Sequence, residues 1–245
     1  MSELPPPDPD LAAKIAAGSA RVEKIEHAGR TLWIKRPEVL RGKLRLYKGD
    51  PARAFSAERA AFLAHHTKNL PIAKLVATGV NFIVFEDAGL SLKLLLRHDT
   101  HPLADRIAII ESAATALAQL HLAGVSHGRP NLKDIMWQDG TVRFIDLERA
   151  SAQRNTPRGH AEDVILFFFS AFAEMDDSAV EIEAARKAYI AAGGAPFWEL
   201  AVRRMAGLGW AYWLTRLAVP FLGRGRDFQA IKPTFAFFKS FKIAS

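Results

Sequence analysis

The sequence predicts an α+β fold with a small strand-rich N-terminal lobe carrying one helix and a larger helical C-terminal lobe. Two observations lead to this prediction. Short runs typical of strands gather before residue 90, and every segment after residue 158 has helical spacing. Hydrophobic residues make up 49% and charged residues 24%, which is typical of a globular chain and excludes wholesale disorder.

The N-terminal lobe is predicted to cover residues 11–88, after a disordered tail at residues 1–10 that is rich in proline and acids. Pro51 favours the first turn of the main helix of this lobe, and residues 11–17 also have helical spacing. Short apolar runs beside turn residues predict four strands. The expected helix is 51–66, and the expected strands are 21–25, 31–36, 71–80 and 81–86.

The C-terminal lobe is predicted to cover residues 89–245, and Gly89 permits a bend where the lobes join. Apolar spacing predicts a long helix over residues 102–122. Asp139-Gly140 is a strong turn signal between two short apolar runs, so we expect one β-hairpin within this lobe. A cleft between the two lobes is the default place for a ligand.

Composition excludes several classes of protein. The chain has no cysteine, so disulfides, thiolate nucleophiles and cysteine-based zinc sites are excluded. No run of 18 residues is free of charge, so no membrane span is expected. The acidic start lacks the basic and apolar regions of a secretory signal, so we expect a cytoplasmic protein.

The positive charge is concentrated at the end of the chain. Residues 203–245 hold eight basic residues and one acid, which accounts for the whole net charge of +7. Eight tryptophans and phenylalanines lie among these bases. This pattern fits ordinary core helices with a basic outer face, or contact with an anionic membrane surface at the inner membrane. Nucleic acid is the least favoured partner.

Two charged residues fall on apolar faces in the N-terminal lobe. Lys35 lies in the strand at 31–36, and Glu58 lies between Phe55 and Phe62 on one face of the helix at 51–66. A lone buried charge is costly, so each of them needs a partner. A Lys35–Glu58 ion pair would give each charge its partner. It would also hold the Lys35 ammonium where it could bind phosphate oxygens. The alternative is two unrelated, half-exposed charges.

A second group of polar residues surrounds the hairpin. The segment His127-Gly128-Arg129-Pro130-Asn131-Leu132-Lys133-Asp134 precedes it, and Phe144-Ile145-Asp146 follows it. Asp134 and Asp146 lie at the two ends of one hairpin, so their carboxylates could converge. Two carboxylates near a lysine that grips phosphate make a site for Mg²⁺ and a nucleotide physically reasonable.

The order of these elements resembles that of the protein-kinase-like fold. Over roughly residues 18–175, the chain contains these elements in order: a lysine in a strand, a glutamate in a helix, an acidic hinge, a long helix, a His-Gly segment, a hairpin and an Ile-Asp pair. The chain is most similar to the bacterial lipopolysaccharide-core (Kdo/heptose) kinases and to RIO-like small kinases. The resemblance implies ATP and Mg²⁺ as cofactors.

The resemblance also implies roles for individual residues. Lys35 would contact the α- and β-phosphates, Glu58 would orient that lysine, and Asp146 would bind the metal ion. The backbone at Glu86 would meet the adenine, and Gly18-Ser19 lies where a phosphate-covering loop belongs. His127 would brace the catalytic loop, and Asp163 matches an aspartate that braces this loop from below.

The chain departs from the family pattern at important positions. Arg129 replaces the catalytic aspartate, and an arginine cannot accept a proton from a substrate hydroxyl. Asp134 replaces an asparagine that binds metal, and it could still hold Mg²⁺. Leu147-Glu148 replaces Phe-Gly, and the glycine-rich loop is nearly absent.

Two functions therefore remain open. The first is transfer of the γ-phosphoryl group of ATP to a hydroxyl, by resemblance that of a lipopolysaccharide-core sugar or, less favoured, of a protein serine. In that case, residues 203–245 would place the site against an anionic membrane or a lipopolysaccharide precursor. The second is a pseudokinase that binds nucleotide or acts as a scaffold, because of Arg129.

Overall fold

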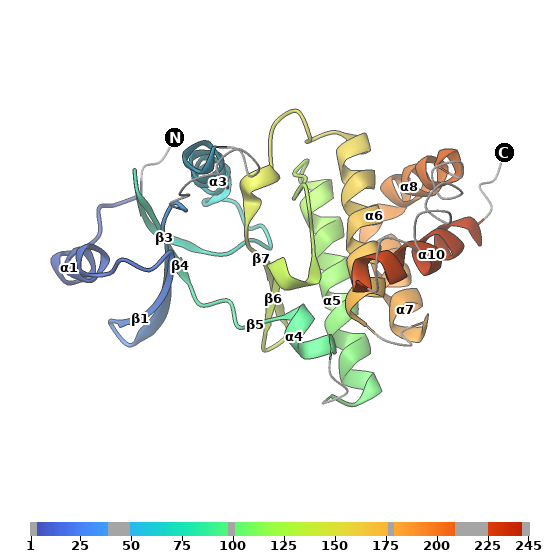
Figure 1. Ribbon diagram of the computed structural model, residues 1–245, viewed down its shortest axis with the longest axis horizontal. Helices are drawn as coiled ribbons and strands as arrows, with labels where there is room; N and C mark the ends of the chain where they lie inside the picture. Colours follow the sequence, from blue (N-terminus) through green and yellow to red (C-terminus); the bar gives the residue numbers. More distant parts are fainter. Residues whose placement is uncertain (1–3, 39–49, 98–100, 176–178, 209–224, 242–245) are drawn as a thin grey trace.

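The computed structural model describes residues 4–38, 50–97, 101–175, 179–208 and 225–241. It confirms the α+β prediction, with a small lobe built on an antiparallel sheet and a larger, mainly helical lobe (Figure 1). Within the described residues, no helix has both the length and the apolar character that crossing a membrane requires.

The N-terminal lobe contains a four-stranded antiparallel sheet in the order β1-β2-β4-β3. Residues Ala28 and Gly29 both have positive φ, of 49° and 71°, and they form the tight turn between the first two strands. The strands are β1 (Val22–His27), β2 (Arg30–Lys35), β3 (Leu75–Gly79) and β4 (Phe82–Glu86).

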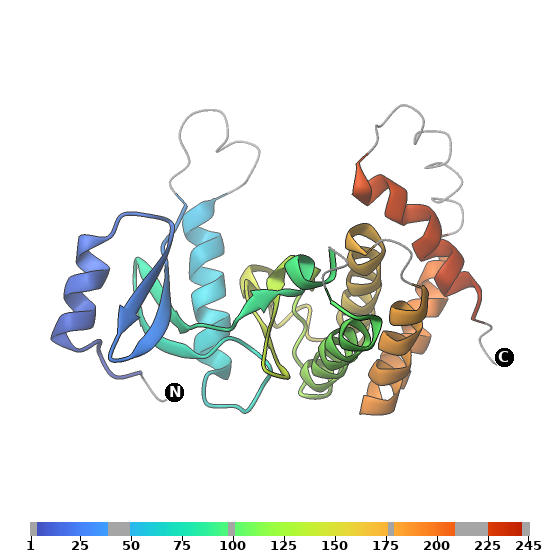
Figure 2. The same cartoon turned by 90° about the horizontal axis from the view of Figure 1, so that it is seen from below.

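The two faces of this sheet are covered by different helices (Figure 2). Leu32 and Ile34 of β2 are fully buried and pack with Leu11 of α1 (Pro9–Ala17). The opposite face packs on α3 (Pro51–His65), where the rings of Phe62 and Phe85 lie 4.6 Å apart. Because side chains alternate along a strand, Trp33 and Lys35 point to the α3 side, where the two lobes meet.

The prediction of a disordered tail over residues 1–10 is wrong for the end of that segment. Helix α1 begins at Pro9, and the Asp8 carboxylate caps it by accepting a hydrogen bond from the backbone N–H of Leu11. Asp8 and Asp10 also lie 2.9 and 3.0 Å from the two ring nitrogens of the buried His27. Asp8 and Asp10, two of the acids that made this segment look disordered, therefore have partners in the fold.

The strand expected over residues 71–80 is divided between the two lobes. Only Leu75–Gly79 pairs within the N-terminal sheet, as β3. The preceding residues run beside the hairpin of the other lobe, where the N–H of Phe144 donates to Pro71 O at 2.7 Å and that of Ala73 donates to Phe144 O at 2.9 Å. This segment is thus a second connection between the lobes.

Gly89 forms the bend between the lobes, as expected. Its φ is +87°, and a Cβ atom at this position would lie 2.3 Å from the carbonyl oxygen of Trp137, so only glycine fits. The chain then forms β5 (Leu90–Ser91) and α4 (Leu92–Arg97). Strand β5 pairs with the predicted hairpin, which consists of β6 (Ile135–Gln138) and β7 (Thr141–Phe144).

The large lobe is built around α5 (Leu103–Leu122), which is buried along one face from Ile109 to His121 and exposed in its first turn. Within the described part of this lobe, further helices pack around α5 or on one another (Figure 1). They are α6 (Pro157–Glu174), α7 (Ala179–Tyr189), α8 (Ala195–Gly207) and α10 (Arg226–Lys239).

Phe235, Phe237, Phe238 and Phe241 of the basic tail lie in the core or pack against it, whereas Phe228 is outside this cluster. The Phe238 ring stacks on Trp198 at 5.0 Å, and Phe237 lies 5.3 Å from Phe168. Lys232 and Lys239 of α10 are exposed. The other aromatic residues of this tail, Trp210, Trp213 and Phe221, lie outside the described residues.

Candidate functional site

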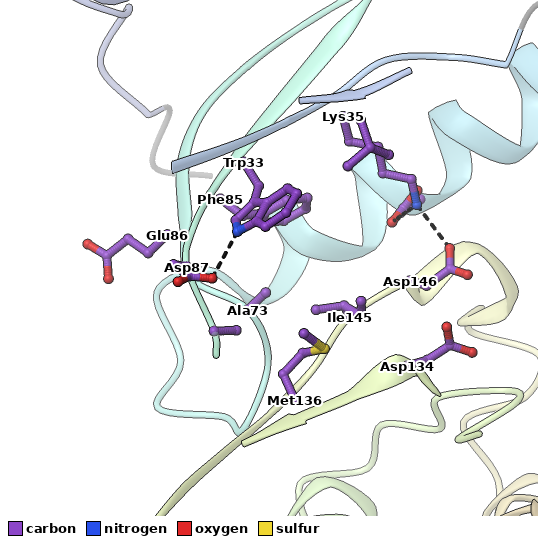
Figure 3. A pocket seen from close by; sticks show the side chains of 13 residues that line it. Trp33, Lys35, Ala73, Phe85, Glu86, Asp87, Asp134, Met136, Ile145 and Asp146 are labelled. Atoms are coloured by element: carbon purple, nitrogen blue, oxygen red, sulfur yellow. Dashed lines mark hydrogen bonds and ion pairs between the residues drawn. The ribbon is translucent and has the colours of Figure 1, made fainter. Parts of the chain in front are cut away.

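A cavity of about 270 Å³ lies between the two lobes. Strand β2, helix α3, the hinge and the β6–β7 hairpin all contribute side chains to it (Figure 3). The end at the hinge is lined mainly by apolar side chains, and the end at Lys35 and Asp146 carries most of the charge (Figure 3). The charged lining residues are Lys35, Glu58, Glu86, Asp87, Asp134 and Asp146.

Lys35 lies at the centre of the charged end. Its ammonium nitrogen is 2.7 Å from Glu58 Oε1, 2.6 Å from Glu58 Oε2 and 3.0 Å from Asp146 Oδ1. Burial disfavours the charged ammonium, but the two carboxylates outweigh it and raise the pKa of Lys35 above its ordinary value. The lysine is therefore a permanent cation inside the cavity.

Glu58 lies on the apolar face of its helix, as the sequence predicted. It lies between Phe55 and Phe62 on the buried side of α3, with only 2% of its surface exposed. An unpaired carboxylate there would be strongly destabilising. The Lys35–Glu58 ion pair expected from the sequence is present and satisfies it.

Asp146 follows β7 and adopts a left-handed conformation, with φ 63° and ψ 54°. This conformation is uncommon for a residue other than glycine, and it turns the carboxylate toward Lys35. Burial acts to raise the pKa of Asp146, but the adjacent Lys35 ammonium outweighs it and holds the pKa below its ordinary value.

Asp134 lies at the other end of the hairpin, in the short 3₁₀ turn η1 (Leu132–Asp134). Its backbone carbonyl accepts a hydrogen bond from the N–H of Ile145 at 3.0 Å, which joins the two ends of the hairpin. Burial raises the pKa of Asp134 to about 6, and the nearby Asp146 adds to the shift. Both carboxylates line one cavity, as the sequence led us to expect.

The segment before Asp134 is fixed by buried hydrogen bonds. His127 Nε2 donates to the carbonyl of Ile145 at 2.9 Å, while Nδ1 accepts from the N–H of Arg129 at 3.3 Å. This pattern requires the neutral ring, and burial lowers the pKa of His127 accordingly. Asp163 on α6 accepts from the N–H groups of His127 and Gly128 at 2.6 and 2.9 Å.

Behind Asp163 lies a polar network that sequence reasoning missed. His121 Nδ1 lies 2.7 Å from the hydroxyl of Tyr189, and its ring stacks on His160 at 4.7 Å. The hydroxyl of Ser126 donates to the carbonyl of Arg154 and lies 2.9 Å from His160 Nδ1. The sequence did contain a signal for this network, because His160 and Asp163 are three residues apart and therefore lie on one face of a helix.

Of the remaining candidate residues, Glu86 lines the cavity and Arg129 does not. Glu86 lines it at the hinge, with its carboxylate 3.0 Å from Arg30. Arg129 does not line it, but its charge acts on Asp134 and helps to hold the pKa of that carboxyl down against burial.

Gly18 and Ser19 also lie outside the residues that line the cavity, which differs from the expectation of a phosphate-covering segment. Arg36 instead fixes the connection between α1 and β1 by contacts of its own. Its guanidinium donates to the carbonyls of Ile15 and Ala20, both at 2.8 Å, and pairs with Glu23.

The donor set at the charged end fits a magnesium ion carried in with a nucleotide. Among the residues that the structure describes, no cluster of three or more metal-ligating side chains occurs. Mg²⁺ is usually held by one or two carboxylates together with phosphates and water. Asp134 and Asp146 supply that number of carboxylates.

The raised pKa of Asp134 predicts a pH-dependent stability. Between the ordinary carboxyl value of 3.8 and about 6, the folded protein binds more protons than the unfolded chain. Stability from this group is therefore lost as pH rises through that window. In the absence of Mg²⁺, Asp134→Asn should gain about 1–3 kcal/mol relative to the parent between about pH 4 and about pH 7.5.

Chemical denaturation at the two pH values measures this gain. Asp139→Asn, at an exposed turn position, is the matched control and should show no such dependence. An effect of Asp134→Asn that is the same at both pH values would contradict the prediction.

The chain is similar to proteins of a known family. Residues 17–189 match the model of the lipopolysaccharide kinase (Kdo/WaaP) family. An uncharacterized protein of Haemophilus influenzae is 30% identical over 194 residues, which cover 79% of this chain and 80% of that protein.

A solved structure is also similar. It is described as a divergent kinase that lacks the glycine-rich loop and regulates membrane ultrastructure of the Toxoplasma parasitophorous vacuole. It is 17% identical, with a TM-score of 0.46, and the match covers 79% of this chain and 72% of that one.

The family match contains the sheet, the hinge, the hairpin and both ends of the charged cavity. It spans more than half of the chain. The resemblance to the lipopolysaccharide kinases is thereby confirmed, and the chain belongs to the lipopolysaccharide kinase (Kdo/WaaP) family, with a protein-kinase-like fold of two lobes.

Proposed function

We propose that this protein transfers the γ-phosphoryl group of Mg²⁺-ATP to a hydroxyl acceptor. The observation that carries the proposal is the contact of Lys35 with Glu58 and Asp146 inside the cavity between the lobes. Lys35 provides a fixed cation for phosphate oxygens, and Asp146 together with Asp134 in the same cavity provides two carboxylates for a metal ion.

Each charged residue then has a distinct task. Lys35 binds phosphate oxygens while Glu58 keeps its ammonium in place. Asp146 and Asp134 hold Mg²⁺, which supplies charge neutralisation on the phosphates when it is bound. Phosphoryl transfer depends mainly on positioning and on stabilisation of charge, so this set of residues can perform much of the work.

Arg129 stands where the family has its catalytic aspartate. A general base at this position typically contributes about 10²–10⁴-fold. Arginine cannot serve as that base, so we expect slow transfer rather than none. The second candidate function, a pseudokinase that binds nucleotide or a partner without transfer, is favoured by the same residue.

The acceptor we propose is a sugar hydroxyl of the lipopolysaccharide core, and the support is the family to which the chain belongs. A protein serine is the less favoured acceptor. Exposed Lys232 and Lys239 on α10 offer positive charge to an anionic membrane or lipopolysaccharide precursor. Because Phe237 and Phe238 pack into the lobe, this contact would be electrostatic and would not insert those rings.

Nucleotide binding is tested by thermal unfolding with and without Mg²⁺-ATP. A ligand at about 100 times its Kd adds about 2.7 kcal/mol to stability, which is a shift of a few degrees. We expect the shift in the parent and in Lys187→Ala, at an exposed lysine of α7, and its loss in Lys35→Ala and Asp146→Ala. No shift in the parent at millimolar nucleotide would refute the proposal.

Transfer is tested at Arg129 with labelled Mg²⁺-ATP and lipopolysaccharide core oligosaccharide. We expect Arg129→Asp, which restores a carboxylate, to raise transfer at least about tenfold. Arg129→Asn removes the charge without adding a base and is the control. A drop in Arg129→Asp would make the arginine itself part of catalysis, and bound nucleotide without transfer in all three proteins would favour the pseudokinase.

Binding of α10 to an anionic membrane is tested by sedimentation with vesicles of phosphatidylglycerol or phosphatidylcholine at low salt. Each lysine near an anionic surface contributes about 1 kcal/mol, so the double variant Lys232→Gln and Lys239→Gln should bind anionic vesicles about tenfold or more weakly. Lys24→Gln with Lys187→Gln, at exposed positions elsewhere, is the control. Equal retention of all three proteins would exclude this role of α10.

A further inference from the structure

Trp33 is the largest side chain that lines the cavity. It precedes Lys35 by two residues on β2, so both side chains point to the same side of the sheet. Its exposed fraction is 36%, whereas its neighbours Leu32 and Ile34 on the other face are fully buried. Trp33 is therefore part of the cavity wall and not of the hydrophobic core.

The indole is held in one orientation by the hinge. Its Nε1–H donates to Asp87 Oδ1 at 2.8 Å, and the same oxygen accepts a longer hydrogen bond of 3.4 Å from the N–H of Gly89. Trp33 also lies opposite Phe85 in the register of the two strands, so both side chains are on one face of the sheet. An aromatic ring fixed in this way loses little conformational freedom when a ligand binds.

The cavity has an aromatic end and a charged end. Met136 and Ile145, from the hairpin of the large lobe, form its apolar surface on the side away from β2 (Figure 3). The Trp33–Asp87 contact lies at the hinge, and Lys35 with Asp146 lies at the opposite end. A flat apolar group with a chain of anionic groups attached would match both ends at once.

We propose that Trp33 is the platform on which the base of the nucleotide stacks, and that it makes the site prefer purine over pyrimidine bases. Asp87 is a positioning residue that fixes the plane of the indole. The inference rests on the proposed function, since it concerns the same cavity. A purine has a larger π surface than a pyrimidine, so it gains more from stacking on a fixed indole.

Calorimetric titration of the full chain with Mg²⁺-ATP, Mg²⁺-CTP and Mg²⁺-tripolyphosphate tests this inference. Base stacking on an aromatic side chain corresponds to a change in Kd of about 10- to 100-fold. We expect Trp33→Leu, which keeps an apolar side chain on the strand, to weaken ATP binding by that factor and to lose the preference for ATP over CTP. Tripolyphosphate, which lacks a base, should bind both proteins alike.

Trp33→Phe keeps an aromatic ring, so we expect it to retain most of the purine preference. Tryptophan fluorescence gives an independent signal, because a base stacked on the indole should quench it. The quenching by ATP should disappear in Trp33→Phe and persist in Trp137→Phe, whose tryptophan does not line the cavity.

The role of Asp87 is tested in the same titrations. Asp87→Ala removes the acceptor of the indole N–H and should weaken ATP binding while leaving tripolyphosphate binding unchanged. Asp87→Asn keeps a side-chain oxygen that can accept the hydrogen bond, so it should restore ATP binding.

The outcomes separate the two proposals. If the parent binds ATP and Trp33→Leu binds ATP and CTP with the same preference as the parent, the role of Trp33 is refuted and the proposed function stands. If the parent binds neither ATP nor tripolyphosphate, the proposed function fails, and the role of Trp33 fails with it.

Discussion

The charged contact of Lys35 with Glu58 and Asp146 is the interaction on which the rest of the site depends. It joins β2, α3 and the end of β7, which belong to two different lobes. Each of the three side chains is largely withdrawn from water, so removal of one leaves the others with an uncompensated charge. The position of α3 and the closed arrangement of the lobes therefore follow from the same ion pairs.

The sequence predicted the parts of the site that depend on local periodicity. Lys35 and Glu58 were recognisable because a charge on an apolar face requires a partner, and Asp134 and Asp146 because a two-residue turn brings the ends of a hairpin together. The partnership of Asp163 with the segment at His127 came from family resemblance, and the geometry agrees with it.

Contacts between segments distant in sequence were not predictable in this way. Asp8 and Asp10 stabilise α1 through His27, and no local pattern indicates that a strand residue will lie beside them. Similarly, Tyr189 reaches His121 from a helix that starts more than fifty residues later. The orientation of the Trp33 side chain depends on Asp87 of the hinge, which only the folded chain brings close.

The double connection between the lobes limits how they can move. The chain crosses between them at the hinge around Gly89, and the segment at Pro71–Ala73 is hydrogen-bonded to β7 at Phe144. A rigid body attached at two points can rotate only about the line that joins them. If the Lys35–Asp146 contact breaks while these two attachments persist, we expect the N-terminal lobe to turn mainly about that line, with the distance between Lys35 and Asp146 as the measure of the movement. Opening along this direction would separate the phosphate-binding cation from the metal-binding carboxylate, so access to the cavity and disassembly of its charged end are one event.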